Sequence, residues 1–150
     1  MSYNKTVWSN GSTPINETNL NKIENELEFL GTDQKLLFNS DTGFYMYENQ
    51  IAYLTENVSD QKNGIVLLWG GYNPDTDTPL AYNYKLTFVP KKFVELGESG
   101  IFEIMGGTDG IRGYKYVKIS NSQISGDNCN TINNGTYHNT SFTLRKVYGV

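Results

Sequence analysis

The feature that most constrains this 150-residue chain is a change of hydrophobic period after Leu30. Up to that point the apolar residues Leu20, Ile23, Leu27 and Leu30 are spaced three, four and three residues apart. This spacing predicts an amphipathic helix over about 17–30. Beyond Leu30, apolar residues alternate with polar ones or form short runs, which is the pattern of β-strands.

The clearest expected strand spans 80–88, where every second residue is apolar: Leu80, Tyr82, Tyr84, Leu86 and Phe88. The continuous apolar run at 65–69 predicts a strand buried on both faces. Shorter candidates lie at 44–47, 51–55, 101–105, 114–119 and 142–148. In the last two the alternation slips by one residue, which a β-bulge would explain.

Turn-forming clusters of Gly, Asn, Asp and Pro separate these segments, as in a β-sandwich or barrel. Aromatic residues make up 13% of the chain, too many for a disordered protein. We therefore expect a mainly β fold. A connector and oligomerisation helix over 1–34 would precede an antiparallel β-sandwich or barrel head over 35–150.

Charge and composition argue against several functions. A net charge of −4 without a basic block disfavours nucleic acid and anionic lipid as partners, and no apolar run is long enough to insert into a membrane. The single cysteine, Cys129, excludes an internal disulfide and a Cys-based zinc site. The single histidine, His138, has no nucleophile elbow beside it. We expect no cofactor, no metal and no enzymatic activity.

The apolar stripe of the expected helix has two interpretations. It packs against its own domain, or it forms the seam of a short intermolecular bundle through Leu20, Ile23, Leu27 and Leu30. About two heptads of leucine and isoleucine do not fix the number of chains in such a bundle.

Carboxylates give no clear catalytic or metal site. A glycosidase needs two carboxyl groups about 5–10 Å apart across a cleft, and the sequence singles out no pair among its sixteen acidic residues. Residues 73–77 place oxygen-bearing side chains at alternate positions, as a calcium loop begins. However, Thr78 stands where an EF-hand has glycine and Tyr84 where it has glutamate. This segment is interpreted as a polar turn.

Saccharide sites combine an aromatic face with amides and carboxylates that bond to hydroxyl groups. Trp69 ends a buried-looking run and is interpreted as core. Two tyrosines are expected in loops with suitable neighbours, which gives these candidate binding residues: Tyr72, Asn73, Asp75, Asp77, Tyr137 and His138.

Two sets of motifs resemble phage proteins. The segments 5–8, 13–16 and 19–24 (KTVW, TPIN and NLNKIE) resemble the opening of tail and baseplate proteins of phages that infect Gram-positive bacteria. The segments 63–69, 88–91, 124–126 and 144–150 (NGIVLLW, FVPK, ISG and LRKVYGV) resemble, in that order, a C-terminal domain of phage receptor-binding and tail-fibre proteins.

The resemblance implies a virion component of the phage tail, made in the bacterial host cytoplasm, homotrimeric, and in contact with other tail or baseplate proteins. Its β head would bind a host cell-wall saccharide. One alternative is a purely structural component that contacts only virion proteins, and another is an enzyme that degrades wall polysaccharide. The family often has a longer shaft between helix and head than the few residues that follow Gly31 here.

Overall fold

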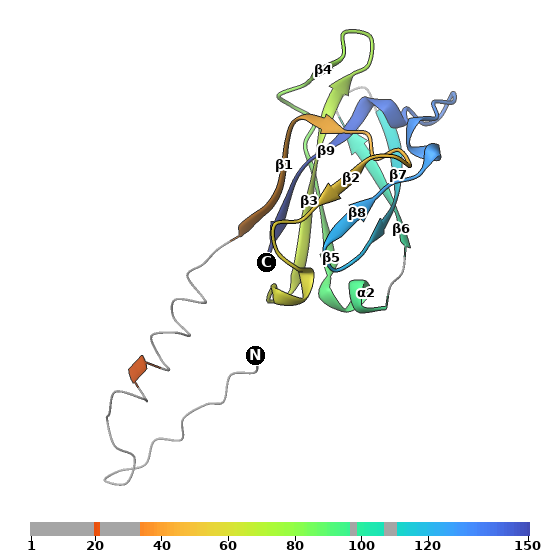
Figure 1. Ribbon diagram of the computed structural model, residues 1–150. Coiled ribbons are helices and arrows are strands. Elements are labelled where there is room, and N and C mark those ends of the chain that lie inside the picture. The colour runs from red at the N-terminus through yellow and green to blue at the C-terminus, as the bar shows by residue number, and fades with distance from the viewer. Residues whose placement is uncertain (1–19, 22–33, 97–98, 107–110) are drawn as a thin grey trace, which may run out of the picture. The chain divides into compact units, whose positions relative to one another are not determined.

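The computed structural model describes residues 20–21, 34–96, 99–106 and 111–150, with the main chain alone at 99, 101–106 and 111. The chain divides into two compact units, 1–33 and 34–150. The second unit is mainly β and antiparallel (Figure 1). Its strands are β1 (Lys35–Phe44), β2 (Ile51–Tyr53), β3 (Gly64–Asn73), β4 (Thr78–Pro79), β5 (Lys85–Pro90), β6 (Ser99–Gly106), β7 (Ile111–Ile119), β8 (Gln123–Ser125) and β9 (Phe142–Gly149).

Short helical segments complete the second unit. They are the α-helix α2 (Lys91–Glu95) and three 3₁₀ turns, η1 (Val58–Asp60), η2 (Asn128–Thr131) and η3 (Asn139–Ser141). Five residues of helix are too few to produce the period that a sequence reading depends on, so α2 was not predicted. The N-terminal helix expected at 17–30 lies outside the described residues, apart from Leu20 and Asn21, which are helical.

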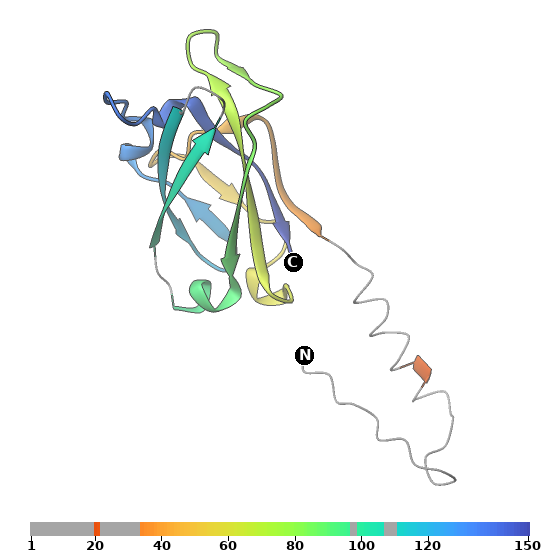
Figure 2. The ribbon, with the colours of Figure 1, turned by 180° about the vertical axis from the view of Figure 1, so that it is seen from behind.

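The strands form two antiparallel sheets. In the first, β1, β9 and β3 are neighbours in that order, and β3 pairs with β5 along its first half and with β4 at its end. The second has the order β2-β8-β7-β6. Figure 2 shows β3 beside its partner β5, seen from behind.

Both sheets contribute to one hydrophobic core. Trp69 of β3 and Leu144 of β9 are fully buried in the same cluster as Val117 of β7 and Ile124 of β8. Burial of each such side chain stabilises the fold by about 1.5–3 kcal/mol. The interpretation of Trp69 as core is confirmed, and its indole N–H donates to the Thr87 hydroxyl at 3.1 Å.

Two expectations about strand faces are wrong. The alternating segment 80–88 forms a strand only from Lys85, and its apolar side chains face outward, with Leu86 61% and Phe88 53% exposed. Segment 114–119 contains no bulge, because β6 and β7 pair without interruption. Instead Lys115 occupies an inward position of β7 and is fully buried.

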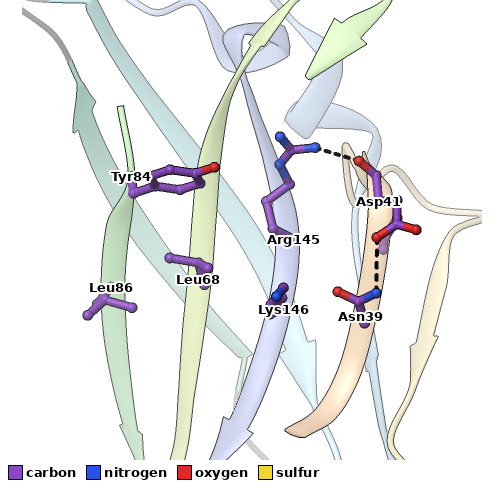
Figure 3. Close-up of a pocket in the computed structure, with 8 residues that line it drawn as sticks. Asn39, Asp41, Leu68, Tyr84, Leu86, Arg145 and Lys146 are labelled. Atoms are coloured by element: carbon purple, nitrogen blue, oxygen red, sulfur yellow. Dashed lines mark hydrogen bonds between the residues drawn. The ribbon is translucent and has the colours of Figure 1, made fainter. Parts of the chain in front are cut away.

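The bulge expected in segment 142–148 is present. Leu68 of β3 pairs with Lys146 of β9, whereas the next residue, Trp69, pairs with Leu144. Arg145 is therefore an extra residue in β9, and it projects toward the outer face of the sheet (Figure 3).

Candidate functional site

A groove of about 500 Å³ crosses the outer face of the first sheet (Figure 3). All four long strands of that sheet contribute to it. It is lined by Asn39, Ser40, Asp41, Leu68, Tyr84, Leu86, Arg145 and Lys146.

The polar side of the groove depends on the bulge in β9. Because Arg145 is an extra residue, it and the following Lys146 both line the groove instead of pointing to opposite faces. The Arg145 guanidinium donates to the main-chain oxygens of Asp41 at 3.0 Å and Leu80 at 3.2 Å. These bonds fix the guanidinium between β1 and the segment that leads into β5.

Gly70 leaves room above β3 for the Arg145 side chain and the Tyr84 ring. A Cβ atom at Gly70 would lie 2.8 Å from Arg145 Nε and 3.2 Å from Tyr84 Cε1. The first distance is shorter than real Cβ contacts, so a side chain at position 70 would displace Arg145. The Tyr84 ring is 54% exposed. The groove thus joins an accessible ring to an amide, Asn39, and a carboxylate, Asp41.

The first group of predicted site residues forms a structural turn. Tyr72 was expected in a loop, but it lies in β3, is only 6% exposed and donates its hydroxyl to Asp77 Oδ1 at 2.6 Å. The bond to Asp77 and burial raise the pKa of the Tyr72 hydroxyl well above its ordinary value. Asn73 Oδ1 accepts from the main-chain N–H of Asp75 at 3.0 Å. Tyr72 therefore offers no ring face to a saccharide. Asp75 is exposed, and its carboxylate has no hydrogen-bond partner among the described residues.

A buried lysine lies next to this turn. Tyr72 packs edge-on against Tyr45, with ring centroids 5.0 Å apart, and Lys115 Nζ lies 5.6 Å from the Tyr45 centroid. Nζ donates to the main-chain oxygens of Tyr45 at 2.9 Å and Asn130 at 3.1 Å. Burial lowers the pKa of Lys115 to about 7, opposed by the nearby Cys129 thiol. These two bonds tie β7 to the segments that contain Tyr45 and Asn130.

The second predicted group is more accessible. The Tyr137 ring is half-buried and meets Tyr114 edge-on at 5.2 Å, while the His138 side chain is exposed. The turn is held by Asn134 Oδ1, which accepts from the main-chain N–H of Tyr137 at 2.9 Å. His138 N–H donates to Arg112 O at 2.7 Å, which ties the loop to β7. The two predicted groups lie on different loops and share no described contact.

The oligomer seam lies largely outside the described residues. Only Leu20 of the four seam positions is described, and its side chain is 47% exposed. Ile23, Leu27 and Leu30 are not described, so the seam and the homotrimer stay predictions.

Metal and thiol chemistry find no support in the described part of the chain. There, no cluster of three His, Cys, Asp or Glu side chains is close enough to hold a metal ion. Burial and the neighbouring Asp127 raise the pKa of the Cys129 thiol to about 11, so it stays protonated at neutral pH. No described helix is long and apolar enough to cross a membrane.

Comparison of the chain with protein-family models, curated proteins and solved structures finds no match.

The groove was missed at the level of sequence, because its residues come from four separate strands. One signal was present: two basic residues, Arg145 and Lys146, interrupt an otherwise apolar strand where the alternation slips. A second was the run of alternating aromatic residues that contains Tyr84.

Proposed function

We propose that the chain is a phage tail or baseplate protein whose β head binds a host cell-surface saccharide without catalysis. The observation that carries the binding proposal is the outer groove, which has the exposed Tyr84 ring on its β5 side and the Asn39 amide and Asp41 carboxylate on its β1 side. Such a ring covers the apolar face of a sugar, and amides and carboxylates bond to its hydroxyl groups. The tail assignment rests on the sequence motifs at both ends of the chain.

The groove favours binding over hydrolysis. Asp41 is the one carboxylate among the residues that line it, whereas glycoside hydrolysis uses two carboxyl groups on opposite sides of the scissile bond. The Asp41 carboxylate also accepts a hydrogen bond from Asn39 Nδ2 at 3.1 Å, which holds it as a binding group. A wall-degrading enzyme would need a second acid here.

The proposal also covers the architecture of the head and its assembly in the virion. In it, the two sheets form a sandwich head, the segment before Lys35 connects the head to the virion, and three chains associate. Three copies of a weak site turn millimolar saccharide affinity into firm attachment. A main chain fixed by sheet hydrogen bonds also keeps the groove in shape without a metal.

Adsorption to purified Gram-positive cell walls tests this proposal. We expect the wild-type protein to bind walls of some species, with or without EDTA, and Tyr84→Ala to lose affinity. The loss of one ring contact is worth about 1 kcal/mol, or about fivefold for a single site, and it multiplies over three sites. Tyr53→Ala is the matched control, because Tyr53 is 67% exposed on β2 and does not line the groove.

Two results would contradict the proposal. If no wall preparation retains the wild-type protein, the head is not an adhesin. If Tyr84→Ala binds as well as Tyr53→Ala while Tyr137→Ala does not bind, the saccharide site lies at the Tyr137 loop and not in the groove.

A purely structural role is the second candidate, and one observation favours it. Tyr82 is 59% and Phe88 53% exposed on the segment that borders the groove, although neither lines it. Exposed apolar side chains in a row are typical of protein contacts. In this case Tyr82→Ser with Phe88→Ser would block incorporation into phage tails, and cell-wall adsorption would be absent from the start.

A further inference from the structure

The groove contains a buried positive charge that no described carboxylate neutralises. Arg145 is 8% exposed, and both described acceptors of its N–H groups are neutral main-chain oxygens. A guanidinium has five N–H donors, so these two bonds leave donors over. The ion pairs of the described residues join Lys35 to Glu56 and Lys92 to Glu95, and Arg145 is in neither.

The acidic side chain that lines the groove is hydrogen-bonded to another partner. Asp41 offers its main-chain oxygen to Arg145, and its carboxylate meets the Asn39 amide instead (Figure 3). Lys146 adds a second positive charge to the same wall. The formal charges of the lining residues are therefore two positive against one negative, or +1, in a chain of net charge −4.

An uncompensated buried charge destabilises the folded protein, so the presence of Arg145 in this position calls for an explanation. Guanidinium groups bind phosphate and carboxylate through paired, charge-assisted hydrogen bonds. Since Arg145 and Tyr84 both approach the position above Gly70, one ligand can reach the ring and the guanidinium together. A neutral sugar would use the ring and leave the charge without a partner.

We propose that the groove selects a saccharide that carries a negatively charged group, a phosphate or a carboxylate, which binds Arg145 and Lys146 while the sugar ring packs on Tyr84. This inference rests on the proposed saccharide-binding function and adds to it the charge of the ligand. Lys146 supplies long-range attraction from its more exposed position, and Arg145 supplies the directed hydrogen bonds.

Titration of the ¹⁵N-labelled full chain with matched small probes tests the inference. The probes are glucose, glucuronate and glucose 6-phosphate, which differ only at the sixth carbon, together with inorganic phosphate. We expect the phosphate or carboxylate probes to shift the amide signals of Arg145 and Lys146 and the side-chain Nε–H of Arg145. Glucose should bind at least tenfold more weakly than the better anion, because a hydrogen bond between charged groups is lost. The glucuronate and phosphate arms identify which anion is preferred.

Charge variants and salt give a second measurement. Lys146→Gln should weaken anion binding about two- to fivefold, as expected for a half-buried charge, and Lys118→Gln, an exposed lysine of β7, should not. Raising NaCl from about 0.05 to 0.5 M should weaken anion binding and leave glucose unaffected. Arg145→Lys keeps the charge but loses the paired geometry, so it should bind anions less tightly than wild type. Because Arg145 also ties β1 to the segment before β5, its substitution can prevent folding, and in that case Lys146→Gln is the deciding variant.

Three outcomes would overturn the inference. Glucose could bind as tightly as the charged probes, Lys146→Gln could match Lys118→Gln, or none of the probes could shift the groove signals. In the first two cases the saccharide proposal stands if Tyr84→Ala still loses cell-wall adsorption. If that adsorption is also unchanged in Tyr84→Ala, both proposals fail.

Discussion

The buried Lys115 makes stability depend on pH in a direction that is unusual for a lysine. Its Nζ is bonded only to main-chain oxygens of Tyr45 and Asn130 among described residues, and burial lowers its pKa from 10.5 to about 7. Around it, the titratable groups are the Tyr45 ring and the Cys129 thiol. Between pH 7 and 10.5 the unfolded chain therefore binds more protons at this lysine than the folded one.

The sign and size of the effect follow from this difference. When the unfolded state holds more protons, the free energy of unfolding rises with pH, by 1.36 kcal/mol per unit for one proton. The Cys129 thiol, whose folded pKa is raised from 9.0 to about 11, acts in the opposite direction above pH 9. The window from pH 7 to 9 isolates the lysine. Over these two units we expect the wild type to gain up to about 3 kcal/mol.

Lys115→Met removes the titration and should remove the slope. The absolute stability of Lys115→Met does not report on the titration, because two main-chain oxygens lose their hydrogen-bond donor. Each loss destabilises the fold by about 1–3 kcal/mol. Lys118→Met is the control, since Lys118 is exposed on the same strand and should keep the wild-type slope.

Urea unfolding at pH 7, 8 and 9, followed by tryptophan fluorescence from the buried Trp69, measures the free energy at each pH. A wild-type stability that stays level or falls from pH 7 to 9 would refute the reasoning. So would a Lys115→Met protein that keeps the slope of Lys118→Met, because the titrating group would then be another one.

Three further predictions address the groove, the turn and the assembly. Gly70→Ala should displace Arg145 or Tyr84 and weaken cell-wall adsorption, whereas Gly135→Ala, with nothing within 4 Å of its added Cβ, should adsorb like wild type. Tyr72→Phe removes the hydroxyl bond to Asp77 and should cost about 1 kcal/mol in urea unfolding, without affecting adsorption. Leu27→Asp should dissociate the expected trimer in sedimentation velocity, and a trimer that survives this change would be held by the heads.

The mainly β character of the protein was predictable from the sequence, but the assignment of strand faces was not. At 114–119 the slip in alternation pointed to a bulge, yet the strand is regular and Lys115 is one of its buried residues. Its charge is accommodated by carbonyl oxygens from two segments that are distant in sequence, Tyr45 and Asn130. No local pattern reports such partners.

The groove likewise depends on contacts between residues that are distant in sequence. The bulge in β9 was predictable from the slip in alternation, and it is what brings Arg145 to the outer face. That Arg145 and Tyr84 would both approach Gly70 depends on the pairing of β3 with both β5 and β9. The local patterns at Tyr84 and Arg145 do not carry this register, so the sequence favoured loop tyrosines instead.

The most direct test of the central claim is to map where a saccharide binds. Amide chemical-shift mapping of the ¹⁵N-labelled protein with soluble fragments of a cell wall that retains it would locate the site. We predict that the largest shifts cluster at Asn39, Asp41, Tyr84, Arg145 and Lys146. Shifts confined to Tyr137, His138 and their loop would contradict the account and place the saccharide at the loop that is bonded to the start of β7.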